Sequence, residues 1–189
     1  MKTLYLLVPG MNNSSDDHWQ SRWEREYPDR FRRIVQTEWD RPACADWIEK
    51  IESDVQTAGP ENVVLVAHSL GCTAVVRWAL QYATMIKGAL LVAPSDCETE
   101  KYRSTFETKG FNPMPLEPVS FKTIVVASTN DEWVHFDRAR LFADAWGSEF
   151  VDVGAKGHIN VGSGFGDWSE GLELLERFHD LKLDTSSFQ

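Results

Sequence analysis

The sequence of 189 residues has few cysteines, no long apolar run and no excess of basic residues. Its three cysteines, Cys44, Cys72 and Cys97, are odd in number, widely spaced and without a C-x-x-C pair. That pattern is typical of reduced thiols in a cytoplasm and argues against a disulfide or a metal site. No stretch approaches the roughly 18 apolar residues of a membrane-spanning helix. We therefore expect a cytoplasmic protein with no bound metal and no membrane partner.

The charge balance is acidic, with 19 Lys and Arg against 29 Asp and Glu, for a net charge of −10. Without a basic stripe, such a surface repels nucleic acid and anionic lipid, so we exclude both as partners. The apolar run at 4–8 is too short for a signal peptide and ends in Pro9-Gly10 with no small-residue cleavage site. A first buried strand is the better interpretation of that run.

The amino-acid composition is typical of a folded protein, with 42% hydrophobic and 12% aromatic residues. A chain of this length buries about 70% of its unfolded surface as one domain. Because we find no internal repeat, low-complexity tract or linker, we expect a single domain over residues 1–189.

Apolar runs and helical periodicities alternate along the chain. They predict strands at 4–8, 31–37, 63–66, 88–93, 123–127 and 149–153, and helices at 16–23, 47–55, 75–80, 139–146 and 169–181. This alternation predicts an α/β fold, a mostly parallel six-stranded sheet with helices on both faces. Residues 96–120 are polar and interrupted by prolines, so we expect a short cover segment there and no large lid. The tail, 182–189, is expected to fray.

The stretch Ala67-His68-Ser69-Leu70-Gly71 lies between a buried strand and a helix. It matches the G-x-S-x-G nucleophile elbow, with alanine in place of the first glycine. A serine on such a turn holds its hydroxyl above the sheet, where backbone N–H groups can stabilise an oxyanion. The motif therefore predicts Ser69 as a nucleophile.

Two further side chains follow predicted strands in the order that α/β-hydrolases use, Ser, Asp and then His. Asp131 follows the strand at 123–127, and His158 follows the strand at 149–153. In this interpretation His158 is the general base, Asp131 orients it, and the N–H groups of Leu70 and Met11 form the oxyanion hole.

Each of these residues also has an ordinary structural interpretation. Ser69 could cap a helix, Asp131 could be a turn residue, and His158 could be a loop histidine. All three fall at the carboxyl ends of strands, however, where α/β sheets form their sites. Asp96, after the strand at 88–93, is a second candidate for the orienting acid; we favour Asp131 and expect Asp96 to be a solvated loop carboxylate.

Several other residues flank the expected site. We expect His18, Trp19 and Trp133 to line the substrate pocket, with Trp168 as a further aromatic candidate. The alternatives are that His18 and Trp19 only form the start of a helix, and that the tryptophans are core residues, as tryptophan more often is. His68 is too close in sequence to Ser69 to serve as its base and should pack beside the elbow.

Motifs along nearly the whole chain carry a family resemblance: Val8-Pro9-Gly10, His18-Trp19-Gln20, Ala67 to Gly71, Ala93-Pro94, Ser128 to Asp131, Gly157 to Asn160 and Ser163-Gly164. The chain resembles the small α/β-hydrolases related to the retinoblastoma-binding protein nine serine hydrolase, including the YdeN-type esterases. One departure is Asn130, where relatives often have an acidic residue.

The resemblance implies a strand order of 2-1-3-4-5-6 and a serine hydrolase that acts on small acyl esters or amides without a cofactor. A competing hypothesis is a protein-interaction module with a vestigial hydrolase site, so a protein partner is left open.

Overall fold

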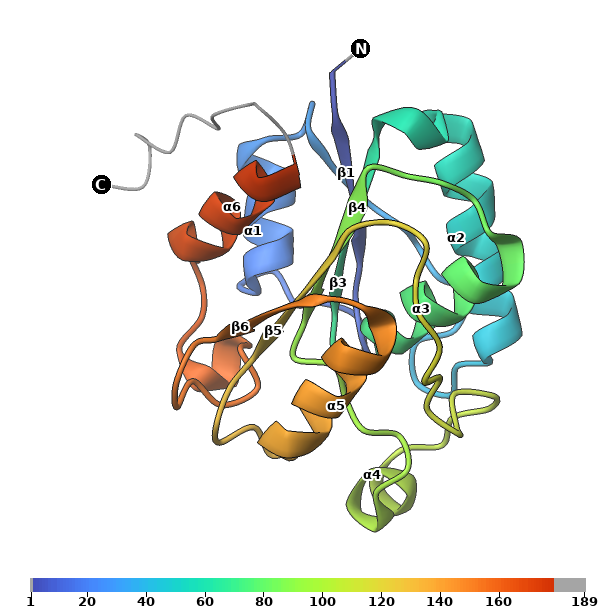
Figure 1. Cartoon of the computed structure of the whole chain (residues 1–189). Helices are drawn as coiled ribbons and strands as arrows, with labels where there is room; N and C mark the ends of the chain where they lie inside the picture. Colours follow the sequence, from blue (N-terminus) through green and yellow to red (C-terminus); the bar gives the residue numbers. More distant parts are fainter. Residues whose placement is uncertain (1, 179–189) are drawn as a thin grey trace.

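The computed structural model describes residues 2–178, which form one sheet flanked by helices (Figure 1). The strands are β1 (Leu4–Val8), β2 (Phe31–Arg33), β3 (Val63–His68), β4 (Gly88–Val92), β5 (Thr123–Ala127) and β6 (Glu149–Asp152). The α-helices are α1 (Trp19–Glu26), α2 (Cys44–Ala58), α3 (Leu70–Tyr82), α4 (Glu100–Thr105), α5 (Phe136–Trp146) and α6 (Ser169–Leu175). Short 3₁₀ turns occur at η1 (Pro60–Asn62), η2 (Val161–Ser163) and η3 (Glu176–Phe178).

The strands lie in the order β2-β1-β3-β4-β5-β6, and every neighbouring pair is parallel. This is the order that the family resemblance implied. From β1 the chain runs outward to β2, then crosses back to β3 and continues in the other direction. Such a reversal opens a crevice at the carboxyl ends of the two central strands, which is where ligands bind in open α/β sheets.

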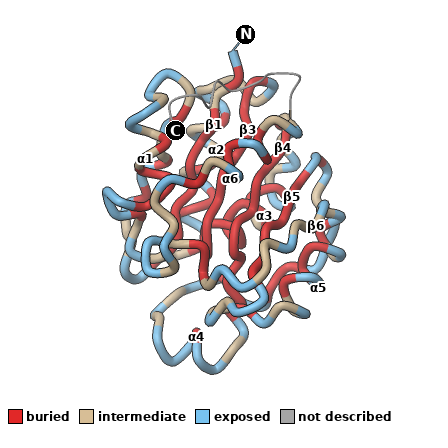
Figure 2. Tube along the Cα trace, turned by 90° about the vertical axis from the view of Figure 1, so that its left-hand side faces the viewer, coloured by how far each residue is buried: buried red, intermediate tan, exposed pale blue. Residues whose placement is uncertain are grey.

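Alternate residues of each central strand face opposite helix layers, because successive side chains of a strand point to opposite faces. Leu65 and Ala67 of β3 pack with α2, α3 and α5, whereas Val64 and Val66 pack with α1 and α6. Both faces are therefore covered, and the strands form the buried band in Figure 2. Double-sided burial explains the unbroken apolar runs of these strands.

Several elements differ from the expectation. The second strand covers only 31–33: it is an edge strand that pairs over three residues with β1, after which the chain leaves the sheet and Val35 is exposed. Helix α1 begins only after the acidic pair at 16–17, with His18 as its N-cap. The cover segment contains α4, capped by the Thr99 hydroxyl, which accepts from the Tyr102 amide.

Two expectations concern the C-terminal part of the chain. The last helix begins at Ser169, as expected, but ends at Leu175 and continues as η3 to Phe178. The rest of the expected helix, 179–181, and the tail at 182–189 lie outside the described residues.

Candidate active site

Ser69 occupies a sharp turn between β3 and α3. Its φ of 57° and ψ of −125° are rare for a residue with a side chain, and its amide donates to the Val92 carbonyl at 3.0 Å. A Cβ on Gly71 would lie 2.3 Å from the Val8 carbonyl oxygen, so only glycine permits this approach of α3 to β1. A Cβ on Gly10 would lie 2.7 Å from that of Ser69. The elbow and the loop after β1 are thus held in direct contact.

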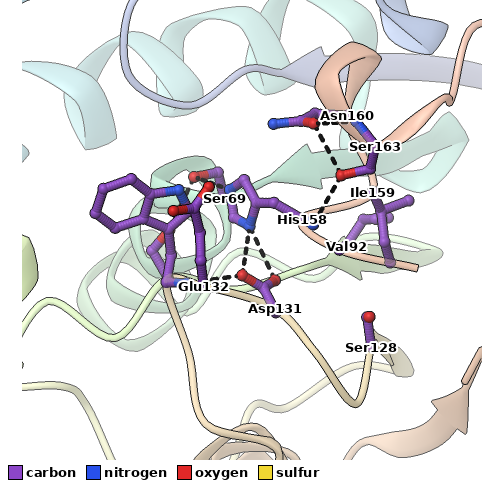
Figure 3. Close-up of polar contacts among 12 residues, drawn as sticks. Ser69, Val92, Ser128, Asp131, Glu132, His158, Ile159, Asn160 and Ser163 are labelled. Atoms are coloured by element: carbon purple, nitrogen blue, oxygen red, sulfur yellow. Dashed lines mark hydrogen bonds and ion pairs between the residues drawn. The ribbon is translucent and has the colours of Figure 1, made fainter. Parts of the chain in front are cut away.

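Ser69, His158 and Asp131 form a continuous hydrogen-bonded series (Figure 3). Nε2 of His158 lies 3.0 Å from the Ser69 Oγ, and its Nδ1 lies 2.9 and 3.0 Å from the two Asp131 oxygens. The Asp131 side chain is fully buried, and that of His158 is 7% exposed. An ionised carboxylate only accepts hydrogen bonds, so Nδ1 carries the proton of a neutral His158. Nε2 is then an acceptor, and the Ser69 hydroxyl donates to it.

The loops that carry the acid and the histidine are tied to each other. The Trp133 amide donates to Asp131 at 2.8 Å. Ser128 Oγ accepts from the Lys156 amide at 2.8 Å, and Asn130 Oδ1 accepts from the Gly157 amide at 2.7 Å. Asn130, the departure from the family pattern, therefore fixes the histidine loop through its amide oxygen.

The histidine loop is also fixed from within. The Ser163 hydroxyl accepts from the His158 amide at 3.0 Å, and it donates to Asn160 Oδ1 at 3.1 Å. Figure 3 shows Ser163 and Asn160 on the side of His158 away from Asp131. The position of the His158 ring is thus determined by loop contacts on both sides.

Ser95 is a site residue that the sequence reasoning missed. Its hydroxyl lies 2.8 Å from the Ser69 Oγ, and the residue is 1% exposed. Since the Ser69 hydroxyl donates to His158, Ser95 is the donor in this second hydrogen bond. A serine that follows a strand carries no sequence signal beyond its place at the end of β4, between Pro94 and Asp96.

The expectation that Asp96 is a solvated loop carboxylate is wrong. Asp96 is 2% exposed, and its Oδ2 lies 2.7 Å from Nε of Arg138 on α5. Its amide donates to the Trp133 carbonyl at 3.0 Å, and its Oδ1 accepts from the Glu98 amide at 3.1 Å. Asp96 therefore joins the loop after β4 to α5 and to the acid loop, and no contact with His158 involves it.

Two more histidines pack beside His158. The His68 ring lies 4.9 Å from the His158 ring and 4.8 Å from the His18 ring, between centroids. His68 donates from Nε2 to the His158 carbonyl at 2.9 Å, since a carbonyl only accepts. Burial lowers the pKa of His68 well below its usual value, and burial with the nearby Arg33 and His158 lowers the pKa of His18 to about 3. Both rings are neutral, and His68 packs beside the elbow as expected.

A pocket of about 180 Å³ opens above Ser69. Met11, His18 and Trp133, three of the residues expected around the substrate, line it together with Ser69, Ser95 and His158. Leu70 is the first residue of α3 and is buried. Trp19 does not line the pocket, because it is fully buried in the core and donates from Nε1 to the Ile159 carbonyl. Trp168 is also a core residue, stacked on Trp23.

A model of the family described as serine hydrolase matches residues 5–177. The chain belongs to the serine hydrolase family. The Bacillus subtilis (strain 168) protein YdeN, whose name describes it as a hydrolase, is 29% identical over 129 residues, which are 66% of this chain and 67% of YdeN.

Solved structures agree with this assignment. The crystal structure of a YdeN-like hydrolase from Pectobacterium atrosepticum is 36% identical, with a TM-score of 0.82 over 94% of this chain and 90% of that one. The Bacillus subtilis YdeN structure has a TM-score of 0.74 at 22% identity, over 94% of this chain and 98% of that one, and supports the fold alone. The chain is thus a YdeN-type serine hydrolase with the α/β-hydrolase fold.

Two kinds of structural feature are absent from the part of the chain that the structure describes. Within residues 2–178, no helix is both long and apolar enough to cross a membrane. Over the same residues, no three His, Cys, Asp or Glu side chains gather where they could hold a metal ion.

Proposed function

We propose that this hydrolase cleaves small acyl esters, and amides, through an acyl-enzyme on Ser69. The hydrogen-bonded series from Ser69 through His158 to the buried Asp131 is the observation that carries the proposal. A buried carboxylate, an imidazole in a fixed tautomer and a strained serine on an elbow are the parts that a serine nucleophile requires.

In the proposed reaction, the Ser69 Oγ attacks the carbonyl carbon while His158 Nε2 takes the hydroxyl proton. The C–O or C–N bond to the leaving group breaks, and His158 returns the proton to that group. Water then attacks the acyl-enzyme with His158 as base, releasing the acid and restoring Ser69. Asp131 keeps the proton on Nδ1 and stabilises the imidazolium.

The negative charge on the carbonyl oxygen needs donors, and we propose the backbone N–H groups of Leu70 and Met11. The first N–H groups of a helix lack carbonyl partners within it, and Leu70 is the first residue of α3. Met11 lines the pocket from the loop that Gly10 brings against Ser69. Both N–H groups would act together with the positive end of the helix dipole.

We further propose a cytoplasmic location. Cys44, Cys72 and Cys97 are free and buried, and burial raises the pKa of Cys44 to about 11 and that of Cys97 to about 12. Burial therefore disfavours the reactive thiolate form of these side chains, as expected of structural cysteines in a reducing compartment.

A fluorophosphonate probe tests the function. We expect rapid stoichiometric labelling of the native protein, and in the Ser69→Ala variant a loss of both labelling and esterase activity by several orders of magnitude with an unchanged melting temperature. Absence of labelling in the native protein would favour the alternative, a protein-interaction module with a vestigial site. Ester turnover through an acyl-enzyme by Ser69→Ala would refute the assignment of Ser69.

A further inference from the structure

The pocket above Ser69 continues into a second, more open hollow of about 480 Å³. Four residues line both spaces: Asn12, Asn13, His18 and Asn160. They come from the loop after β1, the N-cap of α1 and the histidine loop. A substrate seated at Ser69 can therefore extend past these polar side chains.

The amide of Asn13 has a fixed orientation. Its Oδ1 accepts from the Ser14 amide at 2.8 Å and from Nη1 of Arg33 at 2.8 Å, and both partners can only donate. Its Nδ2 donates to nothing among residues 2–178. The half-buried Asn13 thus presents an N–H₂ group to the hollow.

Asn160 has the same arrangement of its amide. Its Oδ1 accepts from the Ser163 amide and from the Ser163 hydroxyl, each at 3.1 Å. Because a backbone amide only donates, Oδ1 is the atom that faces Ser163. Nδ2 of Asn160 likewise has no acceptor within the described chain and is left as a free donor.

His18 adds a third donor. Its Nδ1 accepts from the Gln20 amide, so the proton of the neutral ring is on Nε2. His18 is 5% exposed, and this Nε2 is a buried donor with no acceptor in the described part of the chain. Its pKa of about 3 means that the ring keeps this form at any physiological pH.

Two aromatic side chains also line the pocket. Phe106 and Trp133 lie there with ring centroids 5.0 Å apart. No Asp, Glu, Lys or Arg lines either space. The net charge of −10 disfavours an anionic ligand, so neutral donors without a cation match an uncharged oxygen acceptor.

We infer that the substrate is an ester or amide with a second, uncharged carbonyl group, held by the N–H donors of Asn13, His18 and Asn160. The inference rests on the proposed hydrolysis at Ser69 and names its substrate class. The acceptor atoms of these three side chains are all engaged within the protein, so Asn13, His18 and Asn160 can only donate to a substrate.

The experiment compares esters that differ by one CH₂ replaced with C=O. The acyl series pairs p-nitrophenyl pentanoate with p-nitrophenyl 4-oxopentanoate, and the alcohol series pairs propyl acetate with 2-oxopropyl acetate. Each kcat/KM is divided by the rate constant for alkaline hydrolysis, which removes the intrinsic activation by the carbonyl. We expect a preference for the carbonyl substrate of about fivefold or more in at least one series, as one or two added hydrogen bonds would give.

Asn13→Asp and Asn160→Asp sharpen the test. Each variant keeps the accepting oxygen and its internal hydrogen bonds but replaces the free N–H₂ with a second oxygen. At least one of them should abolish or reverse the preference, whereas the charge-matched control Gln56→Glu, on the exposed side of α2, should retain it.

Equal rates within both series, or a preference unchanged in both Asp variants, would overturn the inference. Native protein that hydrolyses none of these esters and is not labelled by the fluorophosphonate would instead refute the proposed function. The two failures are thus distinguishable.

Discussion

The Ser95 hydroxyl is hydrogen-bonded to the Ser69 Oγ, the atom that would become the nucleophile. The direction of its hydrogen bond follows from the tautomer of His158, since the Ser69 proton is already directed at Nε2. A donor at Oγ stabilises negative charge on that atom when Ser69 loses its proton and again when it leaves the acyl-enzyme. Ser95 is then a catalytic residue in the proposed reaction, because it touches a reacting atom.

We expect Ser95→Ala to lower kcat about tenfold, less than the loss of an oxyanion-hole donor, with unchanged folding. Ser95→Thr, which retains a hydroxyl, should recover part of the loss. The matched control is Ser148→Ala, because the Ser148 hydroxyl pairs with that of Thr123 at 2.6 Å at the far end of β5. Full activity in Ser95→Ala, measured with p-nitrophenyl acetate, would remove this role.

The two acidic candidates make separable predictions. Asp131→Asn should lower kcat by about 10⁴, because the imidazole loses the acceptor that fixes its tautomer. Asp96→Asn should leave kcat within tenfold but destabilise the protein by about 1–3 kcal/mol, since its buried carboxylate is paired with Arg138. Activity assays and urea unfolding on both variants distinguish them. A severe kinetic defect in Asp96→Asn with a mild one in Asp131→Asn would transfer the role to Asp96.

The role of a residue could be predicted from the sequence only where its neighbours along the chain indicate that role. Ser69 is such a residue, since the elbow motif is contiguous between a strand and a helix. The burial of Asp96 depends on Arg138, 42 residues away, and the contact of Ser95 depends on Ser69, 26 residues away. Such pairings arise from strand order and loop path, which composition and spacing do not encode.

At the scale of elements, double-sided burial made the central strands predictable. Strand β5 spans 123–127, as its apolar run predicted, because helices cover both of its faces. The edge strand β2 is shorter than the apolar pattern at 31–37 predicted. It pairs only with β1, and the end of that pairing, not the side-chain pattern, determines where the strand ends. Helix α4 was missed because it has only six residues in a polar, proline-interrupted segment.

We expect the small pocket above Ser69 to limit the length of the acyl chain that the protein accepts. The pocket of about 180 Å³ above Ser69 is smaller than the roughly 300–1,000 Å³ of typical ligand sites, and the hollow of about 480 Å³ that continues it is lined mainly by polar side chains. A long acyl chain would find little apolar surface against which to bury its CH₂ groups, each of which contributes ~0.8 kcal/mol when buried. We expect kcat/KM for p-nitrophenyl esters to peak at acetyl to butyryl and to fall at octanoyl. Activity that rose steadily to palmitoyl, or jumped at the micelle point, would contradict this.

At the scale of the whole molecule, the protein of net charge −10 buries two neutral histidines. His18 and His68 are 5% and 6% exposed, and their rings meet edge to face. The His68 ring also contacts that of His158, and Arg33 lies near His18. The lowered pKa values of His18 and His68 couple folding to pH. Well above pH 6.5 both rings are neutral in the folded and the unfolded states, so their titration contributes nothing there.

Below that pH the unfolded chain binds protons at these histidines while the folded protein does not. Each ring therefore costs up to about 1.4 kcal/mol of stability per pH unit as pH falls from about 6.5, in the case of His18 until about pH 3. His18→Asn removes one such group and keeps an N-cap acceptor for α1, so we expect a shallower loss of stability between pH 6 and 4, measured by urea unfolding. His135→Asn is the matched control, because His135 is an exposed N-cap of α5. Equal slopes in the native protein and His18→Asn would show that His18 takes up its proton as readily when folded as when unfolded.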